Sequence, residues 1–229
     1  MYKNISGIVI LINMALVGCA IASNQISPDI AIEEFPGFKI NQKHISTNPT
    51  LSDYQYQSSK GGAIDIHSCK QAKALDISII AEYEYFRFQQ LLVSCEAVAK
   101  YARARPSAIS NFPARFDKKF FARLPATVEP LLSKADLAQR AGKTFIQYSR
   151  NTMISLENAN TAKLMTPEDE IYITVLARGD FNNDGVEDLL IKSEWYARNA
   201  NGKHIDLLIL SKNAKNTPTH IEWRLQSIK

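Results

Sequence analysis

The sequence lacks the short motifs that mark most enzyme classes. It has no Gly-x-Ser-x-Gly turn, no His-Glu-x-x-His zinc motif, no glycine-rich phosphate loop and no Ser-x-x-Lys motif. Its four histidines are scattered along the chain, so they do not indicate a catalytic or zinc-binding cluster. We therefore expect a protein that is not an enzyme.

Dense positive charge is also missing. The 229 residues include 27 Lys and Arg against 23 Asp and Glu, a formal net charge of +4, without a dense basic run. Nucleic-acid binding needs such a basic patch, so we expect no nucleic-acid partner. The hydrophobic content of 45% is ordinary for one globular domain with a sizeable core.

The apolar run at the N-terminus is too short to cross a bilayer comfortably. It extends from Ile5 to Val17, follows Lys3 and precedes small residues. This order is typical of a signal peptide, which we assign to residues 1–18. Loss of Lys3 with that segment lowers the formal net charge from +4 to +3.

The end of this segment, Leu16-Val17-Gly18-Cys19, resembles the lipobox of bacterial lipoproteins. In that family the cysteine is lipidated and becomes the first residue, which implies a lasting membrane anchor at Cys19 in the periplasm. An aspartate after the cysteine favours the inner membrane in such lipoproteins, so Ala20 implies the outer membrane. The alternative is a non-lipid signal peptide that is cleaved near residues 20–23.

Cysteine is scarce, and its few positions are informative. With Cys19 lipidated, Cys69 and Cys95 remain as an even pair in an oxidising compartment, and we expect a disulfide between them. The alternative is a reactive thiol beside His67, although the other requirements of a cysteine protease cannot be located.

A disulfide constrains the path of the chain between the two cysteines. Residues 70–105 contain neither Gly nor Pro and repeat apolar residues at helical spacing. One straight helix would separate the cysteines by roughly 37 Å at ~1.5 Å per residue. A disulfide needs Cα atoms within about 7 Å. We therefore predict a reversal near Ala81-Glu82, as a helical hairpin or as a strand followed by a helix.

The composition divides the chain into three parts. Residues 19–60 are rich in Asn, Gln, Ser, Thr and Pro and predict a lipidated N-terminus and tether, which rests on the folded body at Phe35 and Phe38. Residues 61–229 predict one globular domain of the α+β class, mostly helical over 61–167, with helices at about 70–105 and 133–148. Residues 168–229 predict a four-stranded antiparallel meander, in which Asn201-Gly202 is a hairpin turn.

The stretch GDFNNDGVEDLLI at residues 179–191 places oxygen-bearing side chains at alternate positions between two predicted strands. Calcium takes about six to eight oxygen ligands and suits such a loop. We predict a calcium site whose ligands are the side chains of Asp180, Asn182, Asp184 and Asp188 and the backbone carbonyl of Val186.

This pattern matches the start of an EF-hand loop, but Ile191 stands where the last, bidentate Glu is expected. It more closely resembles the calcium loops of FG-GAP and VCBS-type repeats, in which an Asp at the ninth position closes the shell and a strand follows. No second copy of the phrase occurs, so a propeller is not expected. The alternative is a polar turn without metal.

Small lipoproteins with one such loop resemble immunity proteins that protect the periplasm from secreted antibacterial toxins. That resemblance implies a protein partner, a toxin effector. The candidate partner-binding residues are Trp195, Tyr196 and Arg198, because these types are favoured in interface hot spots. The alternatives are a general structural or ligand-binding envelope lipoprotein and a periplasmic hydrolase.

Overall fold

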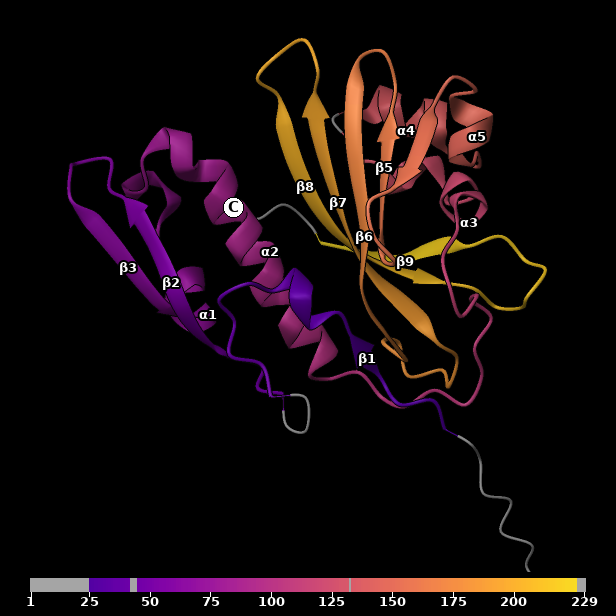
Figure 1. Ribbon diagram of the computed structural model, residues 1–229, viewed down its shortest axis with the longest axis horizontal. Helices are drawn as coiled ribbons and strands as arrows, with labels where there is room; N and C mark the ends of the chain where they lie inside the picture. Colours follow the sequence, from indigo (N-terminus) through magenta and orange to yellow (C-terminus); the bar gives the residue numbers. More distant parts are fainter. Residues whose placement is uncertain (1–24, 42–44, 132, 226–229) are drawn as a thin grey trace, which may run out of the picture.

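The computed structural model describes residues 25–41, 45–131 and 133–225, so the predicted signal peptide and Cys19 lie outside the described residues. Within these ranges the chain has an α+β fold (Figure 1). An antiparallel sheet of seven strands has the order β4-β5-β6-β7-β8-β9, with β1 also paired to β6. The strands are β1 (Asp29–Ile30), β4 (Met153–Leu156), β5 (Thr161–Met165), β6 (Asp169–Gly179), β7 (Asp188–Ala197), β8 (Lys203–Ser211) and β9 (His220–Arg224).

The C-terminal antiparallel meander is confirmed, but it is larger than the four strands predicted. Strands β6 to β9 lie where the alternating pattern places them, and the Asn201-Gly202 turn joins β7 to β8. Two further strands, β4 and β5, extend the sheet beyond β6. They were missed because β4 is a mostly exposed edge strand and β5 has only five residues, so neither has a strong apolar alternation.

Alternate residues of the central strands face two separate cores, as the period of two requires. Leu190 and Leu207 contribute to one core. Ile173, Leu189 and Leu208 face the opposite side and contribute to the other. The sheet is therefore the middle layer of the molecule, with other elements packed on both of its faces.

The long helix α2 (Tyr85–Tyr101) covers the first of these faces, against β8 and β6. The repeated apolar positions seen in the sequence are its buried side: Phe88, Leu91, Leu92, Val93, Cys95, Ala97, Val98 and Ala99. In Figure 1, α2 lies between the sheet and a separate hairpin of two strands.

The predicted disulfide is present, and the chain reverses between its cysteines. Cys69 begins the short helix α1 (Cys69–Ala74), and its Cα atom lies 5.4 Å from that of Cys95 in α2. Within the helical region predicted at about 70–105, residues 75–84 form only the short 3-10 turns η2 (Ile77–Ile79) and η3 (Glu82–Glu84), so the chain reverses near Ala81-Glu82 as expected. Extended backbone at Ile80 and Ala81 separates these turns, where the Ala81 N–H donates to the Gln57 carbonyl.

Residues 29–41 and 45–57, predicted as part of a tether, contribute to the fold. They form β1, the 3-10 turn η1 (Ile32–Glu34) and strand β2 (Thr50–Gln57), which pairs with β3 (Ala63–Ser68). Phe35 and Phe38 are buried against the α2 core, as the sequence suggested for that patch. The polar residues between the apolar ones lie on the outer face of a hairpin whose turn contains Gly61 and Gly62, both at positive φ.

Short elements within residues 112–148 cover the second face of the sheet. They are α3 (Lys118–Ala122), the 3-10 turn η4 (Ala126–Val128), α4 (Lys134–Arg140) and α5 (Phe145–Tyr148). The helical region predicted at about 133–148 contains two helices, and Ser133 caps the first by accepting the Asp136 N–H. Phe112, Phe116 and Phe121 fill the core beneath them.

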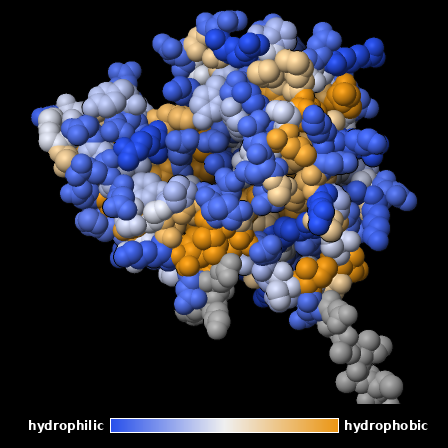
Figure 2. All heavy atoms as spheres, in the orientation of Figure 1, coloured by the Kyte–Doolittle hydropathy of each residue, from blue (hydrophilic) through white to orange (hydrophobic). Residues whose placement is uncertain are grey.

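Polar residues cover most of the face seen in Figure 2, and apolar residues gather in small separate areas. Among the described helices, none is both long and apolar enough to cross a membrane.

Candidate functional site

The predicted metal loop lies between β6 and β7, as expected from the sequence. Strand β6 ends at Gly179 and β7 begins at Asp188, so residues 180–187 form the connection. Asn183 and Gly185 both have positive φ, at 67° and 83°. These two left-handed residues allow the chain to turn tightly enough to bring its polar side chains together.

Asp180 organises the loop from within. Its side chain is buried, and Oδ1 accepts the N–H groups of Asn183 at 2.7 Å and Asp184 at 3.2 Å. Oδ2 accepts the Gly185 N–H at 3.0 Å. Three backbone donors therefore hold one carboxylate at the loop centre, where a positive charge would be attracted.

The other predicted ligand side chains belong to the same network. Asp184 accepts the Val186 N–H through Oδ1 at 2.8 Å and the Asn182 amide through Oδ2 at 3.1 Å. Asp188 accepts the Phe181 N–H and the Ser211 hydroxyl. The four predicted side-chain ligands thus lie in the loop or at the first residue of β7, and all of them take part in these hydrogen bonds.

Burial raises the pKa of Asp188 to about 6, against the lowering effect of its bonds from Ser211 and Phe181. The charges of Asp184 and Asp180 raise it further. The carboxylates are therefore close enough to repel one another when ionised.

The side chains of the loop have hard oxygen atoms that could bind a metal ion, but most of these oxygens accept hydrogen bonds from backbone N–H groups. In the described residues, no group of three or more His, Cys, Asp or Glu side chains is arranged to hold a metal ion. The Val186 carbonyl, predicted as a ligand, accepts no hydrogen bond from the described part of the chain. A cation bound at this loop would have the Val186 carbonyl oxygen as a ligand. The carboxylates that now accept backbone N–H groups would have to rotate toward the cation.

Sequence reasoning missed the contacts of Glu187. This residue lies beside the predicted ligands in the sequence, but its buried carboxylate points away from them and pairs with Arg178, with Nε–Oε1 at 3.2 Å and Nη2–Oε2 at 2.7 Å. The Ser110 hydroxyl also donates to Oε2. The glutamate's charge is therefore neutralised by an arginine nine residues earlier, on the neighbouring strand.

The loop also fastens the chain that leaves α2. Arg105 and Asp180 exchange two backbone hydrogen bonds of 3.0 Å, and the Ala108 N–H donates to the Gly185 carbonyl at 2.8 Å. The Glu187 N–H donates to the Ile109 carbonyl at 2.8 Å. The β6–β7 loop is thus the junction between the sheet and the segment at residues 105–110.

The three candidate partner-binding residues do not form one surface. Trp195 packs against the core on the face of the sheet opposite α2, and its Nε1–H donates to Asp169. Tyr196 faces the other side of the sheet, with its ring 5.6 Å from that of Phe86. Burial raises the pKa of Tyr196 to about 12. Only Arg198 is exposed, and it donates to the Thr166 carbonyl.

No protein-family model, curated protein or solved structure matches this chain.

Proposed function

We propose that this chain is a calcium-binding lipoprotein of the bacterial envelope, lipidated at Cys19 and anchored at the outer membrane, which acts by binding another protein. Its most specific form is an immunity protein that neutralises a secreted antibacterial toxin in the periplasm. The lipid anchor and the toxin come from the sequence resemblances, and Cys19 lies outside the described residues.

The observation that carries calcium binding is the collection of oxygen donors in one tight loop. Asp180, Asp184 and Asp188 supply carboxylates, Asn182 supplies an amide, and Val186 supplies a carbonyl without a hydrogen bond from the described residues. Oxygen-only donors with a flexible geometry suit calcium better than zinc, which prefers nitrogen and sulfur. The ion would screen the mutual repulsion of the carboxylates and hold the loop against residues 105–110.

Isothermal titration of the protein with calcium, after treatment with a chelator, tests this role. We expect one calcium ion per chain, with weaker binding of magnesium because magnesium retains its waters. Asp184→Asn removes one ligand charge at an exposed position and should weaken calcium binding at least tenfold. Asp53→Asn, at an exposed position in β2, is the matched control and should bind as the wild type does. Absence of calcium binding by the wild type would remove this half of the proposal.

Protein binding is supported by the free edge of the large sheet. Among the described strands, β4 pairs only with β5, and its Met153 and Leu156 side chains are 62% and 40% exposed. An exposed edge strand with apolar side chains is a ready template for pairing with another chain. Trp195 and Tyr196 already make contacts within the fold, so the β4 edge is the better candidate for binding a partner.

The toxin proposal is tested at the neighbouring reading frame. If that frame encodes a secreted hydrolase toxin, the purified mature chain should bind it and protect cells that export it to the periplasm. Met153→Lys with Leu156→Lys should abolish binding, whereas Lys60→Glu in the β2–β3 turn should not. A toxin that neither binds the chain nor is neutralised by it contradicts the proposal. The proposal is also contradicted if the neighbouring reading frame encodes an ordinary metabolic protein and a pull-down captures no partner.

A ligand-binding envelope lipoprotein is the second candidate, because the described residues also form a cleft of ligand size, about 840 Å³.

A further inference from the structure

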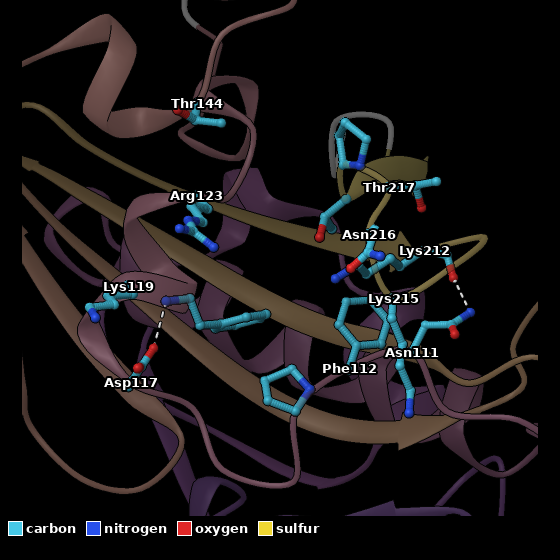
Figure 3. A pocket seen from close by; sticks show the side chains of 14 residues that line it. Asn111, Phe112, Asp117, Lys119, Arg123, Thr144, Lys212, Lys215, Asn216 and Thr217 are labelled. Atoms are coloured by element: carbon cyan, nitrogen blue, oxygen red, sulfur yellow. Dashed lines mark hydrogen bonds between the residues drawn. The ribbon is translucent and has the colours of Figure 1, made fainter.

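This cleft opens between two segments that are far apart in the sequence (Figure 3). One wall is the segment from Asn111 to Arg123, which includes α3. The other wall is the loop between β8 and β9, from Lys212 to Thr219. Thr144, just before α5, lies at a third side. The cleft is on the face of the sheet opposite α2. It adjoins the end of the β6–β7 loop, because Lys212 follows Ser211, which donates to Asp188.

Positive charge is concentrated in this cleft. Its lining contains four cations, Lys119, Arg123, Lys212 and Lys215, and one acid, Asp117, so it holds a formal charge of +3 compared with +4 for the whole chain. Within the described ranges, none of these four cations forms an ion pair, although Arg and Lys residues elsewhere do. The carboxylate of Asp117 is engaged as the cap of α3, where it accepts the Phe120 N–H at 2.7 Å.

The remaining lining is apolar and aromatic. Phe112 and Phe120 line the cleft with their ring centroids 6.4 Å apart, and Pro113 and Pro218 lie beside them. The Phe120 ring also packs on the Phe116 ring, with the ring centroids 4.6 Å apart, and this contact holds it in place. A flat apolar group can therefore rest on rigid aromatic surface while an attached negative group reaches the cations.

The two walls are connected before any ligand binds. The Asn111 side-chain amide donates to the Lys212 carbonyl at 2.8 Å and ties one wall to the other. Within the loop, the Thr217 hydroxyl donates to the Ala214 carbonyl at 2.8 Å. Because the cleft is already shaped, a ligand need not supply the free energy of ordering it.

We propose that this cleft binds a small organic anion, with a flat apolar body and a phosphate or carboxylate group. Its volume of about 840 Å³ lies within the usual range for small-molecule sites. The phosphate or carboxylate contacts the lysine and arginine side chains of both walls, and the apolar body covers Phe112 and Phe120. This site depends neither on the calcium loop nor on a toxin partner.

Calorimetric titration at low ionic strength with 1-naphthyl phosphate tests the chemistry of the ligand. Inorganic phosphate and 1-naphthol supply its two parts separately. We expect 1-naphthyl phosphate to bind with one molecule per chain, and each part alone to bind at least about tenfold more weakly. Salt should weaken the binding, because the cations are solvent-accessible. Equal affinity for inorganic phosphate, or no 1:1 binding of 1-naphthyl phosphate, would overturn the proposal.

Charge reversal on each wall locates the site. Lys119→Glu with Arg123→Glu changes one wall, and Lys212→Glu with Lys215→Glu changes the other. The control, Lys60→Glu with Lys70→Glu, makes the same change of charge at exposed cations of the β2–β3 turn and α1. We expect about a tenfold loss for each wall and none for the control.

Unchanged affinity in both wall variants, or the same loss in the control, would overturn the assignment. Thermal unfolding of each variant shows whether it is folded. If a double variant does not fold, Arg123→Gln and Lys215→Gln as single changes give the same test, with a smaller loss expected for each.

Discussion

We expect reduction of the disulfide between Cys69 and Cys95 to lower the free energy of unfolding by an amount that follows from the structure. Reduction opens a covalent loop with a sequence separation of 26 residues. The chain-entropy relation for a loop of that length gives about 3.5 kcal/mol of stabilisation lost on reduction. For a domain of this size, that loss lowers the unfolding temperature by roughly 7–14 °C.

The packing around the disulfide determines how reduction affects the folded state. Both cysteines are buried in the core under α2, and α1 packs directly on α2. Reduction leaves that apolar contact in place, so the folded state should persist while the unfolded chain gains freedom. We therefore expect a lower unfolding midpoint without loss of the native helix and strand content.

Denaturant unfolding with and without a reductant, followed by far-ultraviolet circular dichroism, measures the difference. The Cys69→Ala/Cys95→Ala variant should be less stable than the reduced wild type, because it also leaves two small cavities. A difference below about 1 kcal/mol on reduction would refute the entropy argument. Free alkylation of both thiols in the unfolded, unreduced protein would refute the bond itself.

Three further predictions concern pH, a buried ion pair and a turn. Burial of Glu129 raises its pKa from 4.5 to about 7, although the positive charge of Arg140 lowers it. The protonated Glu129 side chain therefore contributes to stability below pH 4.5, and this contribution is lost as the pH rises through 7. Relative to Glu129→Gln, the wild type should lose up to about 3 kcal/mol over that range in denaturant titrations. Arg178→Met leaves the buried Glu187 carboxylate without its cation and should cost about 3 kcal/mol in the same assay. Gly37→Ala should destabilise the fold by more than Gly61→Ala, although both glycines have positive φ, because only at Gly37 does the added Cβ lie 2.6 Å from a backbone oxygen.

Each of these predictions has an internal control. A flat difference between wild type and Glu129→Gln from pH 4.5 to 8 would contradict the first. The double change Arg178→Met with Glu187→Gln should recover part of the loss, and no recovery would mean that packing, not charge, explains it. Equal thermal unfolding of the two glycine variants would show that the close contact at Gly37 is relieved without cost.

Sequence periodicity predicted the parts of the fold in which one face of an element is buried. Strands β6 to β9 and the buried side of α2 follow from alternation and helical spacing. The reversal between Cys69 and Cys95 followed from the length of a helix compared with the reach of a disulfide.

Other elements have patterns that apolar content alone does not reveal. The β2–β3 hairpin is built from Tyr54, Tyr56, Ile64 and Ile66 around Gly61-Gly62, within a polar composition that predicted a tether. The break after α1 depends on Asp76, which accepts the Ser78 N–H and starts a 3-10 turn, and no Gly or Pro marks it.

For the candidate site, the sequence predicted the position of the loop and the residues that meet there. It did not predict that Glu187 faces away and pairs with Arg178, because that contact depends on the register of two strands. Strict alternation, however, already places Trp195 and Tyr196 on opposite faces of β7.

We propose above that calcium binds at the β6–β7 loop and holds it against residues 105–110. Amide hydrogen exchange of the mature protein, with saturating calcium and with a chelator, tests this most directly. We expect slower exchange with calcium both at residues 180–188 and at the hydrogen-bonded amides of Arg105 and Ala108. Identical exchange at both segments with and without calcium would contradict it.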